Sequence, residues 1–151
     1  MLANSGTSMD ASAQAEPAAP TEKARQTSGR IVVTVQNFRN DVGDALFALF
    51  RSDAGFPEEP LRAERRVATA IARAQTRVVF EDVEPGVFAI SVLHDEDRNR
   101  KVKTGIFGIP REGIGFSRDA RGRMGPPKFE DAQLTLEPGG DATVTIHMHY
   151  Y

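Results

Sequence analysis

Hydrophobic positions alternate with polar ones near the two ends of the apolar part of the chain, which is the pattern of a half-buried β-strand. In the first run, Ile31, Val33 and Val35 fall at every second position and share one face. The run over residues 142–150 alternates in the same way. Its apolar positions are Val144, Ile146, Met148 and Tyr150, and its polar positions are Thr143, Thr145, His147 and His149. Both runs predict strands that turn one face toward a core.

Two further runs, residues 45–50 and 87–93, are apolar on both faces. Such short apolar runs are typical of buried central strands. Each follows a segment rich in turn-forming residues, at 37–43 and at 84–86. We therefore expect two central strands, each entered through a turn.

The segment 61–74 is ambiguous, because its alanines and arginines also suit an amphipathic helix. Val67, Thr69 and Ile71 fall at every second position and favour an extended segment instead. Another extended run follows at 76–83. Together these elements predict an all-β fold, a β-sandwich of about seven strands.

The 48 residues from 94 to 141 hold eight glycines and four prolines, and only 132–136 predicts a strand among them. A loop of this length in a small domain is usually functional or disordered. Its apolar residues indicate that it folds back and packs: they are Ile106, Phe107, Ile109, Ile114, Phe116 and Phe129.

Residues 1–29 contain no Val, Ile or Phe, and they are rich in Ala, Ser, Thr, Gln, Glu and Pro. Such a segment buries too little apolar surface to offset its chain entropy, so we expect a disordered tail or linker before a domain at 30–151. It also lacks the apolar core of a secretory signal, which leaves a cytoplasmic location open.

Composition excludes several classes of protein. The chain of 151 residues has 40% hydrophobic and 26% charged residues, as an ordinary globular domain has. The absence of cysteine excludes disulfides, thiolate metal sites and cysteine nucleophiles. With no Trp and two Tyr, an aromatic platform for nucleic acid or sugar is disfavoured. No apolar run reaches the length of a membrane span.

Two stretches resemble known families. FEDVEPGVFAISVLHDED, Phe80 to Asp97, resembles the strand–turn–strand of transthyretin-like and carboxypeptidase-regulatory-like sandwiches. GIFGIPREGIGFSRDARGRMGPPKFEDAQLTL, Gly105 to Leu136, resembles family 2141 of the bacterial domains of unknown function, together with Gly55-Phe56-Pro57 and His94-Asp95-Glu96. The resemblance implies a transthyretin-like or immunoglobulin-like antiparallel sandwich that is exported to the periplasm or secreted. It implies no activity.

Family members tend to carry, after the histidine, an acidic loop that resembles a calcium-binding loop. In this chain Asp95, Asp97 and Asn99 keep alternating oxygen ligands suited to a hard cation. Arg100 stands where the turn favours glycine, and Lys103 replaces a later Asp. A calcium-dependent adhesion or assembly module, with calcium held by these three residues, is therefore an alternative to the first hypothesis, in which no cofactor binds.

Other chemistry has weaker support. His147 and His149 would leave one face of a strand, and zinc would need His94 to join them. Ser117 lacks the Gly-x-Ser-x-Gly elbow of hydrolases. Transthyretin-like hydrolases rely on a Tyr-Arg-Gly-Ser terminus that this chain does not have, so a small hydrolase is disfavoured and we expect no enzyme.

The charge is unevenly distributed. The whole chain has a formal charge of −2, but residues 98–128 hold nine cations and two acids, a net +7, so the other residues carry −9. The cations are Arg98, Arg100, Lys101, Lys103, Arg111, Arg118, Arg121, Arg123 and Lys128. The sequence thus predicts a non-catalytic binding or structural module whose basic loop engages an anionic partner. Candidate partners are an envelope polymer, a lipid headgroup or an acidic protein, and nucleic acid is disfavoured.

Overall fold

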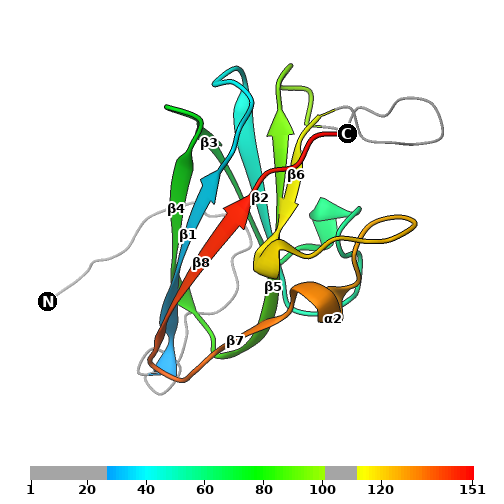
Figure 1. Cartoon of the computed structure of the whole chain (residues 1–151). Coiled ribbons are helices and arrows are strands. Elements are labelled where there is room, and N and C mark those ends of the chain that lie inside the picture. The colour runs from blue at the N-terminus through cyan, green and yellow to red at the C-terminus, as the bar shows by residue number, and fades with distance from the viewer. Residues whose placement is uncertain (1–26, 101–111) are drawn as a thin grey trace, which may run out of the picture.

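The computed structural model describes residues 27–100 and 112–151, which form two β-sheets packed face to face (Figure 1). One sheet has three strands in the order β4-β1-β8, and the other has β3-β2-β5-β6 with β7 paired to β5. The strands are β1 (Gly29–Gln36), β2 (Asp44–Phe50), β3 (Arg65–Ala70), β4 (Thr76–Val83), β5 (Gly86–Asp95), β6 (Ile114–Phe116), β7 (Leu134–Leu136) and β8 (Asp141–His147). Three short helical turns join them: η1 (Pro60–Arg62), η3 (Ser117–Asp119) and α2 (Phe129–Ala132).

The predicted all-β sandwich is confirmed, with eight strands in the described residues. One pairing departs from a purely antiparallel arrangement, because β1 and β8 run parallel from Arg30↔Asp141 to Gln36↔His147. Alternation assigns each strand an inner and an outer face but carries no information about the direction of a distant partner. The ambiguous segment 61–74 contains β3, so its extended assignment is confirmed.

The main core lies between the sheets and includes the inward-facing residues of β1, β2, β4, β5 and β8. Ile31, Val33 and Val35 are fully buried, and Val144 and Ile146 of the neighbouring strand β8 lie beside them on the same inner face. The outer residues of β8 stay exposed or half-buried. This is the inner and outer division that the sequence predicts for the first and last strands.

A second, smaller apolar cluster covers the outer face of the five-stranded sheet. Ala48 and Phe50 of β2 point away from the main core and contact Phe116 and Phe129 of the long loop region. The ring of Phe56 packs edge-on against three of these aromatic rings, with centroids 5.2–6.0 Å apart. Because β2 is covered on both faces, its run is apolar throughout.

The long Gly/Pro-rich loop contains more regular structure than its sequence predicts. Besides β7, its described part includes β6 and the two turns η3 and α2, each only three or four residues long. Elements this short have no measurable period, so their pairing comes from tertiary contact. Ile114, Phe116 and Phe129 pack as expected, whereas Ile106, Phe107 and Ile109 lie outside the described residues, as does most of the tail at 1–29.

Candidate functional site

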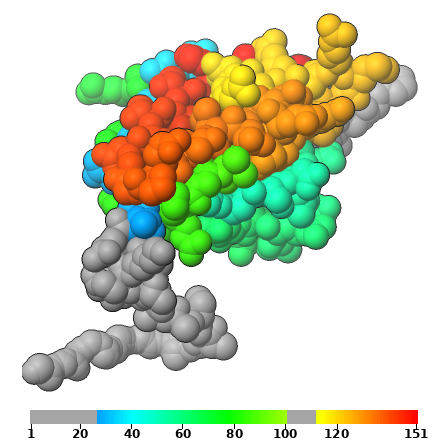
Figure 2. Space-filling model, turned by 90° about the horizontal axis from the view of Figure 1, so that it is seen from below, coloured from blue at the N-terminus to red at the C-terminus, as the bar shows by residue number. Residues whose placement is uncertain are grey.

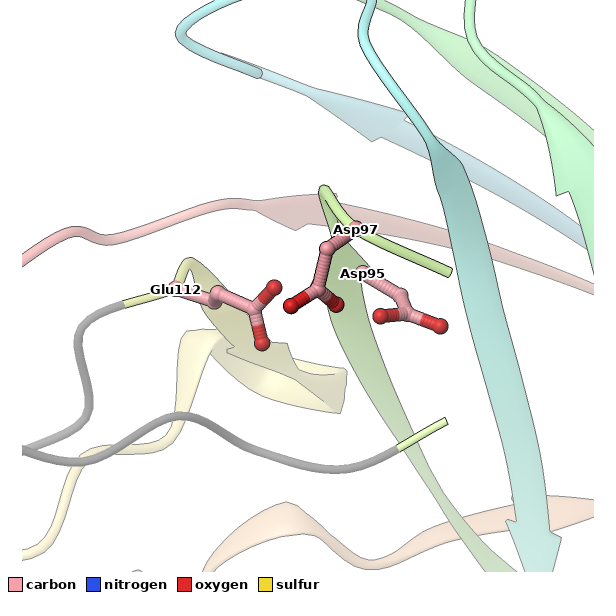
Figure 3. A group of neighbouring side chains, drawn as sticks. All are labelled: Asp95, Asp97 and Glu112. Atoms are coloured by element: carbon pink, nitrogen blue, oxygen red, sulfur yellow. The ribbon is translucent and has the colours of Figure 1, made fainter. Parts of the chain in front are cut away.

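Three carboxylates meet where β5 ends and β6 begins (Figure 3). Asp95 ends β5, Asp97 lies in the turn after it, and Glu112 stands just before β6. One oxygen of each lies within 4.8 Å of the others. Antiparallel pairing of Leu93 with Ile114 brings these residues to the same end of the sheet. Asp95 and Glu112 are 0% and 1% exposed, while Asp97 is exposed.

The last two residues of β5 and the turn after it, residues 94–100, are called the acidic loop below. Its fold depends on Asp95, whose carboxylate accepts the backbone N–H of Asn99 at 3.1 Å and of Arg100 at 2.8 Å. Arg98 and Arg100 adopt left-handed backbone angles, with φ of 57° and 65°. The turn that favours glycine at position 100 is therefore made by arginine, and the hydrogen bonds to Asp95 offset its strain.

The two arginines of the acidic loop lie against carboxylates. Arg98 Nε is 3.4 Å from Asp44 Oδ2, and Arg100 Nη1 is 3.4 Å from the same oxygen. Arg100 is also 3.7 Å from Asp95. The side-chain nitrogen of Asn99 donates to Asp97 at 3.2 Å. These contacts partly compensate the charge of the loop, so both arginines already have carboxylate partners within the chain.

A buried histidine at the start of the acidic loop links it to two other segments of the chain. His94 is fully buried, and its Nε2 lies 2.7 Å from the carbonyl oxygen of Val42. Because a carbonyl only accepts, Nε2 carries a proton, and in the tautomer with its proton there Nδ1 accepts from the Tyr150 hydroxyl at 2.8 Å. That hydroxyl in turn accepts the backbone N–H of Arg39 at 3.0 Å. Tyr150 thereby ties the C-terminal segment to the end of β5.

An ion pair closes the same end of the sandwich. Arg39 donates two hydrogen bonds to Glu96, at 3.0 and 2.5 Å, and Asn40 donates a third at 2.8 Å. These donors lower the pKa of Glu96 from 4.5 to about 2, the bond from Arg39 having the largest effect. The Arg39 guanidinium also lies 4.8 Å from the centre of the Tyr150 ring, and burial raises the pKa of that tyrosine.

Residues 118–128, called the cationic loop below, present a different arrangement. Its four cations are exposed: Arg118, Arg121, Arg123 and Lys128. Within residues 27–100 and 112–151, neither Arg118, Arg123 nor Lys128 forms an ion pair. Figure 1 shows the loop extending away from the sheets between η3 and α2.

Two acids at the cationic loop, Asp119 within it and Asp131 just after it, accept hydrogen bonds from the chain itself. Asp119 accepts the backbone N–H of His147 at 2.9 Å and contacts Nδ1 of its ring at 2.9 Å. Asp131 accepts the backbone N–H of Lys128 at 3.2 Å. Arg121 donates to Nδ1 of His149, and burial followed by the charge of Arg121 lowers the pKa of that histidine. The neutral ring is the form that can accept this bond.

The structure separates the predicted basic surface into two parts. Arg98 and Arg100 lie in the acidic loop, whereas the other four described cations lie in the cationic loop. The predicted contributors Lys101, Lys103 and Arg111 lie outside the described residues. The two described phenylalanines among the cations do not face outward, since Phe116 and Phe129 are 7% and 8% exposed.

The hypothesis of a three-histidine zinc site is wrong. His94 is buried with its two ring nitrogens against Tyr150 and Val42, while His147 and His149 lie against Asp119 and Arg121. A zinc site would need His94 to join His147 and His149, and the structure does not bring the three rings together. Of the described residues, the only group of three or more His, Asp or Glu side chains close enough to share an ion is Asp95, Asp97 and Glu112.

Glu112 was missed as a partner of Asp95 and Asp97. The available signal was the short alternation Glu-Gly-Ile-Gly-Phe at 112–116, which predicts a strand only if a pairing partner is already known. Ser117, considered as a nucleophile, is fully buried. Its hydroxyl donates to the carbonyl of Ala132 at 2.6 Å and accepts the N–H of Ile90 at 3.0 Å.

The sequence matches a family model described as an uncharacterized protein conserved in bacteria (DUF2141) over residues 33–145. The chain belongs to this family. The DUF2141 match runs from β1 into β8 and so includes both the acidic loop and the cationic loop. Comparisons with curated proteins and with solved structures give no match. None of the helices in the described part of this DUF2141 domain has the length and apolar character needed to cross a membrane.

Proposed function

We propose that this domain is an exported, non-catalytic binding module whose cationic loop binds an anionic partner. The observation that carries the proposal is the exposure of Arg118, Arg121, Arg123 and Lys128 on one projecting loop. Export is expected from the family resemblance. The burial of the Ser117 hydroxyl between Ala132 and Ile90 supports the non-catalytic part of the proposal.

Local charge, rather than net charge, supports binding of an anion by this loop. The chain as a whole is weakly acidic, with a formal charge of −2, so attraction must come from a region where cations are concentrated. Asp119 and Asp131 lie beside the cations, but their carboxylates accept hydrogen bonds from the chain itself. A phosphate, sulfate or carboxylate group would find several donors within one short segment.

The experiment measures retention on immobilised dextran sulfate as salt is raised. We expect the wild-type chain to bind at low salt and to elute before about 0.5 M, where screening leaves a Debye length of only a few ångströms. The triple variant Arg118→Glu, Arg121→Glu, Arg123→Glu should pass through unretained. Its urea unfolding curve should match wild type, which separates lost binding from lost folding.

A matched control reverses three exposed arginines elsewhere. Arg62, Arg66 and Arg77 are exposed on η1, β3 and β4, and their replacement by Glu changes the net charge by the same amount. This control should remain retained on dextran sulfate, slightly weakened by the change in net charge. Equal loss of retention in the two triple variants would contradict the proposal, because binding would then follow total charge.

A second candidate function is calcium-dependent binding or assembly through the acidic loop. It is favoured by the approach of Asp95, Asp97 and Glu112, whose oxygens lie within 4.8 Å of one another. Hard cations prefer such oxygen ligands. The arginines at 98 and 100 already compensate part of this negative charge, and for that reason the cationic loop is the first proposal.

Thermal unfolding with calcium and with a chelator tests the second candidate. A cation bound only by the folded state at millimolar concentration should raise the midpoint by about 3–6 °C. Asp97→Asn and Glu112→Gln should abolish the shift, while the exposed control Asp53→Asn should keep it. Equal midpoints for the wild type in calcium and in chelator would eliminate this candidate.

A further inference from the structure

The tip of the cationic loop carries an apolar side chain with no cover from the described residues. Met124 is 100% exposed, more than Leu61 at 78% or Tyr151 at 64%. Single exposed apolar residues are common on protein surfaces and carry little meaning by themselves. Met124 differs in its setting, because it follows Arg123 directly and stands between Arg121 and Lys128.

The chain holds Met124 at the tip through a tight turn. A Cβ atom at Gly122 would lie 1.7 Å from the carbonyl oxygen of Gly125, so the backbone passes there at a distance only glycine permits. Gly125 itself has a φ of +146°. Between these two glycines only Arg123 and Met124 are left to form the outermost part of the loop.

The base of the loop is anchored in the second apolar cluster. Ala120 is 8% exposed and belongs to that cluster, and Pro127 is buried at the returning end of the loop. Figure 2 shows the yellow-to-orange segment near residue 120 standing out from the rounded body of the domain. The loop is thus a projection with a fixed base, cationic sides and an apolar tip.

We infer that the anionic partner of this loop is a phospholipid surface, into which Met124 inserts while the neighbouring cations pair with headgroup phosphates. The inference rests on the proposed function and specifies its partner. A soluble polyanion offers phosphate or sulfate groups but no apolar layer, so it would leave Met124 in water. A membrane interface offers both within one side-chain length, anionic groups outside and acyl chains beneath.

Neither part of this surface suffices alone. Each cation near an anionic membrane strengthens binding by roughly a factor of five, and one partly buried methionine adds about as much. The sum predicts reversible, salt-sensitive attachment rather than stable anchoring.

The first experiment compares sedimentation with vesicles of phosphatidylcholine alone and with vesicles that contain phosphatidylcholine and phosphatidylglycerol in equal parts. The wild-type chain should sediment with the mixed vesicles and not with phosphatidylcholine alone. Met124→Ser should weaken vesicle binding about fivefold and leave dextran sulfate retention unchanged. Vesicle binding equal to that of wild type would overturn the lipid inference, while the proposed function would still stand on dextran sulfate.

The second experiment places a reporter at the tip. The chain contains no tryptophan, so Met124→Trp introduces the only one. Its fluorescence should shift to shorter wavelength with the mixed vesicles and stay unshifted with dextran sulfate. Leu61→Trp, at another exposed apolar position, should not shift with either ligand.

Each failure has a separate meaning. A tip tryptophan that stays in water while the vesicles are bound would show purely electrostatic attachment and would overturn insertion. A shift with dextran sulfate, or loss of retention there in Met124→Ser, would indicate that the loop recognises polyanions through Met124 itself, against a lipid partner. If neither vesicles nor dextran sulfate retain the wild-type chain, the proposed function fails and this inference fails with it.

Discussion

The acidic loop at residues 94–100 and the cationic loop at 118–128 both carry arginines, yet the arginines have different surroundings. Arg98 and Arg100 lie within 3.4–3.7 Å of Asp44 or Asp95. Arg118 and Arg123 are exposed and form no ion pair with the described residues. Asp95 and Asp44 contact the arginines of the acidic loop, whereas Asp119 and Asp131, which also accept backbone N–H groups, form no ion pair with Arg118 or Arg123 among the described residues.

This difference separates a role in stability from a role in binding. Charges that meet partners inside the chain hold a turn in place and lose part of their attraction for outside ions. Charges left facing water contribute little to folding but keep their field available. Substitutions in the acidic loop should therefore act mainly on the free energy of unfolding, and those in the cationic loop mainly on binding.

The largest expected loss of stability comes from substitution of Asp95. Asp95→Ala removes a fully buried carboxylate that accepts two backbone N–H groups and lies near Arg100. We expect a loss of about 3 kcal/mol in the free energy of unfolding, measured by urea denaturation, because two part-buried backbone N–H groups and Arg100 lose the carboxylate that holds the turn. Asp119→Ala is the counterpart beside the cationic loop, and since its carboxylate is 42% exposed it should cost less than about 1 kcal/mol. Similar losses in the two variants would remove the distinction between the loops.

Acid should weaken the end of the sandwich next to the acidic loop. The pKa of Glu96 falls from 4.5 to about 2 in the folded chain. A lowered carboxyl pKa stabilises the fold above the unfolded value, and this contribution is lost as pH falls from about 4.5 to 2. Because Arg39 is partly exposed, solvent screens part of this interaction. We expect the free energy of unfolding to fall by about 1–2 kcal/mol over this pH range.

Glu96→Gln measures that contribution directly. At pH 7 the free energy of unfolding of the variant should be about 1–2 kcal/mol lower than that of wild type. The difference between the two unfolding free energies should shrink toward zero as the pH approaches 2. A difference that stays constant over this range would show that the ion pair with Arg39 does not stabilise the fold.

The bridge made by Tyr150 should have an effect of similar or smaller size. Tyr150→Phe removes the hydroxyl that donates to His94 and accepts from Arg39. We expect a loss of about 1–1.5 kcal/mol in urea denaturation, because two polar groups lose a partner. Tyr151→Phe is the matched control, since Tyr151 is 64% exposed, and it should match wild type. An unchanged free energy of unfolding in Tyr150→Phe would indicate that water replaces the hydroxyl.

The smallest effect compares the arginines themselves. Arg98→Gln with Arg100→Gln should lower the free energy of unfolding by about 1 kcal/mol, because contacts with partly buried carboxylates are lost. Arg118→Gln with Arg123→Gln should change it by less than about 0.5 kcal/mol while reducing retention on dextran sulfate. The reverse order of stabilities would contradict the division between the loops.

Several features could be predicted from local sequence, because each depends on neighbours along the chain. Alternation at Ile31, Val33 and Val35 identifies the inner face of β1, and Ala45 to Phe50 is apolar because β2 is covered on both sides. β6 and Glu112 could not be predicted in this way. A three-residue strand has too few positions for a period, and Glu112 meets Asp95 only through the pairing of β6 with β5.

The order of residues is enough to identify the class of fold, the family, and the many cations in the region after β5. Periodicity and composition are local or additive properties, so they can be taken directly from the order of residues. The folded chain is needed to see which cations are paired, that His94 is buried against Tyr150, and that Met124 stands at the tip of the cationic loop. These depend on contacts between residues far apart in the chain, such as the 56 positions that separate His94 from Tyr150.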